Sequence, residues 1–235
     1  MIMEVKEVMA KSILNKSWIA DYCINPYIGC QHACLYCYAA YYTKRIYNIE
    51  KEWGKFVYVK INAPQLLLKE IKIKKKGSVY LSSLTDPYQP LEKKYKLTRR
   101  ILEILIRNNC SIIIQTKSSL VLRDLDILKG YKNVEVGLTI ITLNEEKARK
   151  LEPFSDLPTK RMETLKILKE SGIKNFLFLG PILPFSDIEE ILEIVKTAKD
   201  FVDKFYFDKL NFKPGIAERM NLNVTNEKLN SYYFD

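Results

Sequence analysis

The chain has 235 residues, of which 47% are hydrophobic and 28% charged, a composition that excludes a disordered chain and a disulfide-stabilised mini-protein. Its 38 Lys and Arg residues outnumber its 28 Asp and Glu residues and give a formal net charge of +10. This charge suits either a nucleic-acid partner or the ion-paired surface of a heat-adapted protein.

Short apolar segments alternate with helical segments along the chain. We predict strands at residues 22–27, 79–84, 111–117, 134–141, 176–182 and 205–210, and an additional strand at residues 56–61. We predict helices at residues 39–47, 64–75, 98–108, 123–129, 160–171 and 188–199. Repeated strand-helix units of this length predict an α/β fold, a partial (β/α)6 TIM-type barrel with an open six-stranded parallel sheet and helices outside.

We expect a single domain over residues 1–235, with a short lead-in at residues 1–20 and a short extension at residues 212–235. Few glycines and prolines are present, so long linkers are not expected. The first residues lack the apolar core of a signal peptide, and no apolar run is long enough to span a membrane. The sequence therefore predicts a cytoplasmic protein with no membrane partner.

Polar residues follow the second, third and fourth predicted strands. Ser82, Ser83 and Asp86 follow the second strand, Lys117 ends the third, and Thr139 lies late in the fourth. The loops after the strands of a parallel barrel converge on one face, so these residues are site candidates. The alternative interpretation for each is a helix cap or a solvated turn.

Cys30, Cys34 and Cys37 form a Cys-x-x-x-Cys-x-x-Cys triplet directly after the first predicted strand. Iron-sulfur clusters are usually held by four cysteines, so three would leave one iron open to another ligand. The alternative is a zinc site completed by His32 or Cys23. Structural zinc sites usually combine two separated knuckles, and no second knuckle follows here.

The segment around the triplet, residues 25–39, resembles the spore photoproduct lyase-like branch of the radical S-adenosylmethionine (SAM) superfamily. Further segments resemble that branch in the same order: residues 85–92, 97–99, 116–118, 123–124 and 151–153. The resemblance covers roughly residues 11–184, which is most of the chain.

The resemblance implies a [4Fe-4S] cluster on Cys30, Cys34 and Cys37, with SAM bound to the fourth iron through its amino and carboxylate groups. Reductive cleavage of SAM would give a 5′-deoxyadenosyl radical that abstracts hydrogen from a substrate. The cofactors carry this chemistry, and the protein binds and orients them. An electron donor such as ferredoxin or flavodoxin is also implied.

The resemblance further implies a set of residues around SAM: Tyr36, Ser82, Ser83, Lys117, Thr139 and Gly180. Lys117 matches a lysine that approaches the carboxylate of SAM, and Thr139 matches a serine with a similar role. Tyr36 and Gly180 match positions near the adenine. Ser82 and Ser83 lie where the second strand of the superfamily contacts the amino group.

Asp86 and Tyr88 are candidate catalytic residues, because this polar and aromatic segment lies on the same predicted face. The alternative is a proline-bounded turn that caps the next helix. Spore photoproduct lyases use an additional cysteine shortly after the second strand to return a hydrogen atom to the product radical. Residues 81–86 contain no cysteine, so repair of the spore thymine photoproduct is not expected.

The sequence therefore predicts a radical SAM enzyme, lyase-like, whose first candidate substrate is nucleic acid. An aromatic and basic face supports that choice through base stacking and phosphate contact: Tyr41, Tyr42, Lys44, Arg45 and Tyr47. Two alternatives remain open. One is a radical enzyme for a peptide, a protein or a small metabolite, and the other is a non-enzymatic zinc-binding nucleic-acid module.

Overall fold

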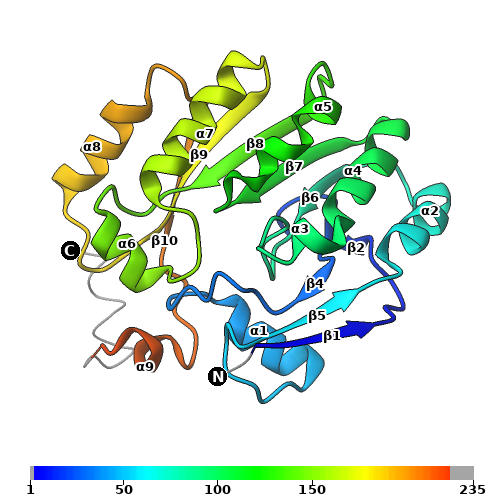
Figure 1. Cartoon of the computed structure of the whole chain (residues 1–235), viewed down its shortest axis with the longest axis horizontal. Coiled ribbons are helices and arrows are strands. Elements are labelled where there is room, and N and C mark those ends of the chain that lie inside the picture. Colours follow the sequence, from blue (N-terminus) through cyan, green and yellow to red (C-terminus); the bar gives the residue numbers. More distant parts are fainter. Residues whose placement is uncertain (1–2, 223–235) are drawn as a thin grey trace.

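The main sheet of the computed structural model, which describes residues 3–222, is open and largely parallel (Figure 1). Its parallel strands are, in spatial order, β3 (Tyr22–Ile24), β6 (Ser78–Leu81), β7 (Ser111–Thr116), β8 (Val134–Thr139), β9 (Lys174–Ile182) and β10 (Lys204–Lys209). A short strand, β2 (Asn15–Lys16), pairs antiparallel with β3 and completes seven strands. The predicted α/β partial barrel is confirmed, and β2 and β10 form its two edges.

The prediction of a single strand at residues 22–27 is wrong, because the structure has two separate strands there, β3 and β4 (Tyr27–Ile28). Between them, Pro26 has no N–H group to continue a ladder, and its carbonyl accepts a hydrogen bond from the Lys60 N–H at 3.0 Å. The strand β4 pairs with β5 (Phe56–Lys60), which corresponds to the additional strand predicted at residues 56–61. The other side of β5 pairs with β1 (Glu4–Val8) in a separate three-stranded sheet.

The long helices lie close to their predicted ranges: α1 (Ala39–Tyr47), α2 (Ala63–Ile73), α4 (Leu97–Arg107), α7 (Pro158–Glu170) and α8 (Ile188–Ala198). The helix predicted at residues 123–129 is instead a 3-10 turn, η1 (Ser119–Asp124), followed by α5 (Leu125–Leu128). Short helices that were not predicted are α3 (Glu92–Tyr95), α6 (Glu145–Leu151) and α9 (Ile216–Met220). Among the helices of residues 3–222, each is too short or too polar to span a membrane.

The hydrophobic core fills the space between the outer face of the sheet and the helices. On β7, Ile112 and Ile114 are almost completely buried in this core, together with Leu102 and Leu105 of α4. Side chains alternate along a strand, so Ile113 and Gln115 point to the opposite, inner face. Burial of each such Leu or Ile contributes roughly 1.5–3 kcal/mol, which fixes the strand register and leaves the inner face available for a site.

The lead-in predicted at residues 1–20 contains β1 and β2, so this segment takes part in both sheets. Of the predicted extension at residues 212–235, residues 223–235 lie outside the described part of the chain.

Candidate functional site

A cavity of about 750 Å³ lies on the inner side of the open barrel. Its volume falls in the range of sites for small molecules and cofactors. The sequence-predicted residues that line it are Cys30, Cys34, Tyr36, Cys37, Ser82, Ser83, Asp86, Lys117, Thr139 and Gly180. The cysteine loop and the strands of the sheet therefore bring nearly all of the predicted site residues to one place.

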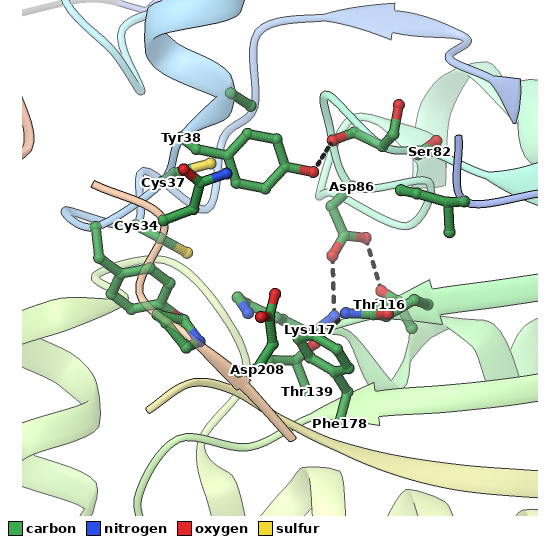
Figure 2. Close-up of a pocket in the computed structure, with 18 of the residues that line it drawn as sticks. Cys34, Cys37, Tyr38, Ser82, Asp86, Thr116, Lys117, Thr139, Phe178 and Asp208 are labelled. Carbon is green, nitrogen blue, oxygen red and sulfur yellow. Dashed lines mark hydrogen bonds between the residues drawn. The ribbon is translucent and has the colours of Figure 1, made fainter. Parts of the chain in front are cut away.

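The cysteine loop begins at Gly29, whose backbone adopts φ +85°, a conformation that favours glycine. A Cβ atom on Gly29 would lie 2.5 Å from the carbonyl oxygen of Phe56, so the loop also needs glycine to pass close to β5. Beyond it, Cys30 and Cys34 are buried and Cys37 is partly buried, and all three thiols are free. Figure 2 shows Cys34 and Cys37 together on one side of the cavity.

Hydrogen bonds from three distant parts of the chain hold this loop. Thr85, after β6, donates to the Gly29 carbonyl at 2.6 Å. The N–H of Leu35 donates to the carbonyl of Leu151 at 2.9 Å, at the end of α6. From α9, the Arg219 guanidinium donates to the carbonyls of Leu35 and Cys37, both at 2.9 Å. The loop is thus fixed by tertiary contacts in addition to its own turns.

The chemistry of the three thiols fits an iron-sulfur cluster. Burial raises the pKa of Cys30, Cys34 and Cys37, so the thiolates need a compensating positive charge nearby. The iron of such a cluster would supply that charge, and three cysteines would leave one iron of a four-iron cluster open. Within residues 3–222, no three His, Cys, Asp or Glu side chains are arranged to hold a single metal ion.

Lys117 enters the cavity from the end of β7, and its ammonium group lies 3.4 Å from a carboxylate oxygen of Glu152. Glu152 is buried and also accepts a hydrogen bond from the Tyr36 hydroxyl. Burial alone would raise the pKa of the Glu152 carboxyl, but Arg161 and Lys117 outweigh it and lower the pKa to about 2. Glu152 is therefore an anion that holds Lys117 and Tyr36 beside the cysteines.

Arg161 of α7 completes this buried network. Its guanidinium pairs with Glu152, donates to the Thr139 carbonyl at 2.6 Å and donates to the Asp156 carbonyl at 2.8 Å. Sequence reasoning missed Glu152 and Arg161 as site residues. Glu152 belongs to one of the short segments that carry the family resemblance, so a signal was present for it, whereas Arg161 lies in an ordinary helical pattern.

Asp86 is a structural anchor of the cavity wall. It accepts hydrogen bonds from the Thr116 hydroxyl at 2.6 Å and from the Lys117 N–H at 2.9 Å, as Figure 2 shows. A carboxylate oxygen of Asp86 also lies 3.4 Å from Nε2 of His32 in the cysteine loop. Burial opposes ionisation of Asp86, but these partners hold its pKa below the usual value.

Tyr88 does not join the other candidates. Its side chain is fully buried in the hydrophobic core, and its hydroxyl donates to Asp124 at 3.0 Å. Tyr88 is absent from the residues that line the cavity within the described chain, so its predicted contact with the substrate is corrected. The turn that starts at Asp86 directs Asp86 and Tyr88 to opposite sides.

Polar side chains on the inner face of the sheet form a hydrogen-bonded row. The hydroxyl of Tyr80 donates to Gln115 at 2.6 Å, and the amide of Gln115 donates to the Thr139 hydroxyl at 3.0 Å. Ser82 donates to the carbonyl of Ile24 at 3.3 Å, and the Ser83 carbonyl accepts from Tyr38 at 2.6 Å. The row joins β6, β7 and β8, and its groups are positioned to contact a polar ligand.

Aromatic rings continue this inner face of the sheet on β9 and β10. Phe176 and Phe178 of β9 and Tyr206 of β10 line the cavity, and the rings of Phe176 and Tyr206 meet edge to face at 5.2 Å. A Cβ atom on Gly137 would lie 2.0 Å from the Phe176 ring, so glycine lets this ring lie across β8. The cavity thus combines a polar wall with an aromatic one.

The residues of the predicted aromatic and basic face of α1 have different surroundings in the structure, and only part of the face lies at the cavity. Tyr42 lines the cavity, and the ammonium of Lys213 lies 5.6 Å from the centre of its ring. Arg45 packs over the ring of Tyr41 at 5.5 Å. Lys44 pairs with Glu50 at 2.6 Å, and the hydroxyl of Tyr47 accepts from Lys60 at 3.4 Å. Tyr42 is therefore the member of this face that reaches the site.

Solved structures with the same fold include one with a dinucleoside bound and one with a peptide bound. A spore photoproduct lyase variant with bound AdoMet and dinucleoside spore photoproduct superimposes with a TM-score of 0.70 at 16% identity, covering 94% of this chain and 67% of the other. SuiB of Streptococcus suis, bound to the precursor peptide SuiA, superimposes with a TM-score of 0.61 at 16% identity, covering 91% of this chain and 45% of the other. At these identities the likeness concerns the fold.

Sequence comparison identifies the family. Protein MJ0683 of Methanocaldococcus jannaschii is 45% identical over 213 residues, which cover 89% of this chain and 79% of that protein. The sequence model described as the Radical SAM superfamily matches residues 24–198, a range that contains the cysteine loop and strands β4 to β9. The chain therefore belongs to the radical SAM superfamily.

Proposed function

We propose that this protein is an enzyme that binds a [4Fe-4S] cluster on Cys30, Cys34 and Cys37 and cleaves SAM reductively to abstract hydrogen from a substrate. The observation that carries the proposal is the placement of these three free thiols and Lys117 on one cavity. When bound, the cluster and SAM together supply the radical chemistry, with an electron from a donor such as ferredoxin or flavodoxin.

The residues of the chain bind and orient the cofactors. Lys117, held by Glu152, offers a fixed positive charge for the carboxylate of SAM. The hydroxyls of Ser82, Ser83 and Thr139 offer hydrogen bonds to its polar groups. Tyr36 and the backbone at Gly180 are assigned to the surroundings of the adenine. The rings of Phe176 and Phe178 present an apolar surface to the space where a radical would form.

Nucleic acid is the substrate class that we favour. The net charge of +10 attracts phosphates, and Tyr42 with Lys213 places a ring and a cation together at the cavity. The spore photoproduct lyase structure, which shares this fold, contains a dinucleoside. The second candidate is a peptide, since SuiB shares the fold with its precursor peptide bound.

We infer a reaction other than repair of the spore photoproduct. The segment after β6 has no thiol, and among residues 3–222 the cysteines that line the cavity are those of the triplet. Cys23 is buried in β3 beside Ser83, and Cys110 precedes β7 at the other end of the sheet. A hydrogen atom returned to a product radical would thus come from a group other than a cysteine thiol.

The decisive experiment is anaerobic reconstitution, followed by analysis of iron, sulfide and zinc. The reconstituted protein is then mixed with dithionite and SAM, and 5′-deoxyadenosine is measured by chromatography. We expect an iron-sulfur protein that forms 5′-deoxyadenosine. Stoichiometric zinc without sulfide or product would overturn the proposal and favour the zinc-binding nucleic-acid module.

A further inference from the structure

The cavity extends to both edges of the open sheet. On one side it is lined by Ile19, in the loop between β2 and β3, and on the other by Tyr206, Phe207 and Asp208 of β10. The residues assigned to SAM come from the cysteine loop and from the ends of β6 to β9, and none of them comes from β2 or β10 at the edges of the sheet. The remaining space, which reaches both sheet edges, is available to a second molecule.

Exposed apolar side chains lie at both of these edges. Trp18 is fully exposed, and its neighbour Ile19 is 54% exposed although it lines the cavity. On β10, Phe207 and Tyr206 are 52% and 43% exposed. Clusters of exposed apolar side chains at the border of a cavity are typical of binding surfaces, whereas isolated ones are common on any protein.

The loop that carries Trp18 is held at its base. The hydroxyl and the N–H of Ser78 donate to the Asp21 carboxylate at 2.8 and 2.7 Å, and the Asp21 N–H donates back to Ser78 at 3.2 Å. At its start, Asn15 and Lys16 pair with β3. The exposed indole thus projects from a fixed loop, which lowers the entropic cost of binding a partner.

Positive charges accompany the aromatic side chains. Lys16 lies 4.6 Å above the ring of Tyr22 next to the loop, and Lys213 lies over Tyr42 at the cavity. The acidic Glu135, which also lines the cavity, is paired with Lys204 at 2.6 Å. Aromatic rings interleaved with cations match the alternation of bases and phosphates in a single strand. In a duplex the base faces are already stacked and are not available to an indole.

We propose a stacking surface in two parts, Trp18 at one edge of the sheet and the exposed aromatic side chains of β10 at the other, that holds unpaired bases of a single-stranded nucleic acid next to the cavity. This inference rests on the proposed function only in taking nucleic acid as the class of substrate. Binding at the stacking surface itself needs neither the cluster nor radical chemistry. It assigns to Trp18 a binding role outside the cofactor site.

The test uses the intrinsic fluorescence of the iron-free protein. The chain has two tryptophans, and Trp53 is nearly buried, with an indole N–H for which no hydrogen-bond partner is recorded among the described residues. Trp53→Phe therefore removes no known hydrogen bond and leaves Trp18 as the reporter. An oligothymidylate of about 12 nucleotides, within the usual site sizes, should quench this emission saturably, and salt should weaken the binding.

Binding is then measured directly with the same oligonucleotide carrying a fluorescent label. Trp18→Ala should weaken binding by about tenfold, as expected from the loss of one stacked base, while Trp18→Phe should retain most of it. Ile73→Ala is the matched control, because Ile73 is an exposed apolar residue at the end of α2. Circular dichroism checks that each variant is folded.

The outcomes separate the two proposals. One outcome is that the oligonucleotide binds the wild type and Trp18→Ala with equal affinity and does not change the emission of Trp18. The stacking surface would then be wrong, while nucleic acid would remain the favoured substrate. If no oligonucleotide binds at low salt, both fail. Quenching by an unstructured peptide, or a blue shift with anionic vesicles, in the absence of oligonucleotide binding would assign the surface to that other partner and overturn the proposal.

Discussion

The ammonium of Lys117 lies 3.4 Å from Glu152, a carboxylate that is also paired with Arg161 and hydrogen-bonded to Tyr36. Lys117 directly follows β7, and Glu152 belongs to the connection between α6 and α7. Since Tyr36 lies between Cys34 and Cys37 in the chain, Glu152 links the cysteine loop to the cation assigned to SAM. In the proposed site, the position of SAM would therefore depend on a carboxylate that need not contact it.

Glu152→Gln should destabilise the protein strongly, because it leaves the buried guanidinium of Arg161 without its counter-ion. Breaking a buried pair in this way costs about 3–5 kcal/mol, measured as the free energy of unfolding of the iron-free protein. Glu146→Gln is the control, since Glu146 pairs with Lys150 on the exposed surface and its substitution should leave the free energy of unfolding nearly unchanged. Equal changes in the free energy of unfolding for the two substitutions would contradict a stabilising ion pair between Glu152 and Arg161.

The dependence of stability on pH should reveal the same carboxylate. The pKa of Glu152 is lowered to about 2 in the folded protein, so its stabilising contribution is complete above its ordinary pKa of 4.5. The contribution should be lost as the pH falls from about 4.5 towards 2. Denaturant unfolding across this range should show a shallower loss of stability in Glu152→Gln than in the wild type. Parallel curves would show that Glu152 titrates normally.

Lys117→Met should weaken SAM binding by about ten- to a hundredfold, because a hydrogen bond to a charged group contributes roughly 1.5–3 kcal/mol. Iron content should remain unchanged, since the three thiols are intact. Equilibrium binding of SAM to the reconstituted protein measures the effect, with Lys72→Met on the exposed end of α2 as control. Unchanged affinity in Lys117→Met would remove Lys117 from the SAM site.

Cys34→Ala should abolish cluster binding and 5′-deoxyadenosine formation while the barrel remains folded. The matched control is Cys110→Ala, because Cys110 is also a free cysteine but lies outside the cavity. Iron and sulfide analysis, the visible absorption spectrum and circular dichroism together separate loss of the cluster from loss of the fold. Full iron loading of Cys34→Ala would be incompatible with the assigned ligands.

Gly137→Ala should displace the Phe176 ring, because the new Cβ would lie 2.0 Å from it. Overpacking of this kind costs about 1–3 kcal/mol in the free energy of unfolding. Phe176→Leu removes the ring, so Gly137→Ala should cost less when introduced in that background. A double-mutant cycle measured by denaturant unfolding tests the coupling, and strictly additive effects would refute it.

Local patterns explain why the main sheet could be predicted. The strands of the sheet have an apolar face such as Ile112 and Ile114 on β7, and that alternation is visible in the sequence. The division of residues 22–27 was missed because it depends on Pro26 meeting Lys60 of a strand far along the chain. The short helices α3, α6 and α9 span too few turns to show a helical period.

The residues of the candidate site could also be predicted where a local pattern marks them, and could not where they depend on contacts between distant parts of the chain. Cys30, Cys34 and Cys37 lie in one short segment, so their spacing was sufficient to single them out. Arg161 reaches the network from the interior of α7, and only the packing of that helix beside β8 brings it to Glu152. Tyr88 was misplaced because the direction of a side chain after a tight turn depends on the turn geometry, which spacing alone does not give.

The contacts of Arg219 have a consequence for biosynthesis. This arginine holds the backbone of the cysteine loop from a position 182 residues after Cys37. While the chain is still being translated, the loop leaves the ribosome long before its partner in α9 exists. The carbonyls of Leu35 and Cys37 gain these hydrogen bonds only once nearly the whole barrel has been synthesised. The cysteine loop therefore reaches its final set of hydrogen bonds only after α9 has been made, and a cluster bound as proposed would be held by this complete loop only from that point on.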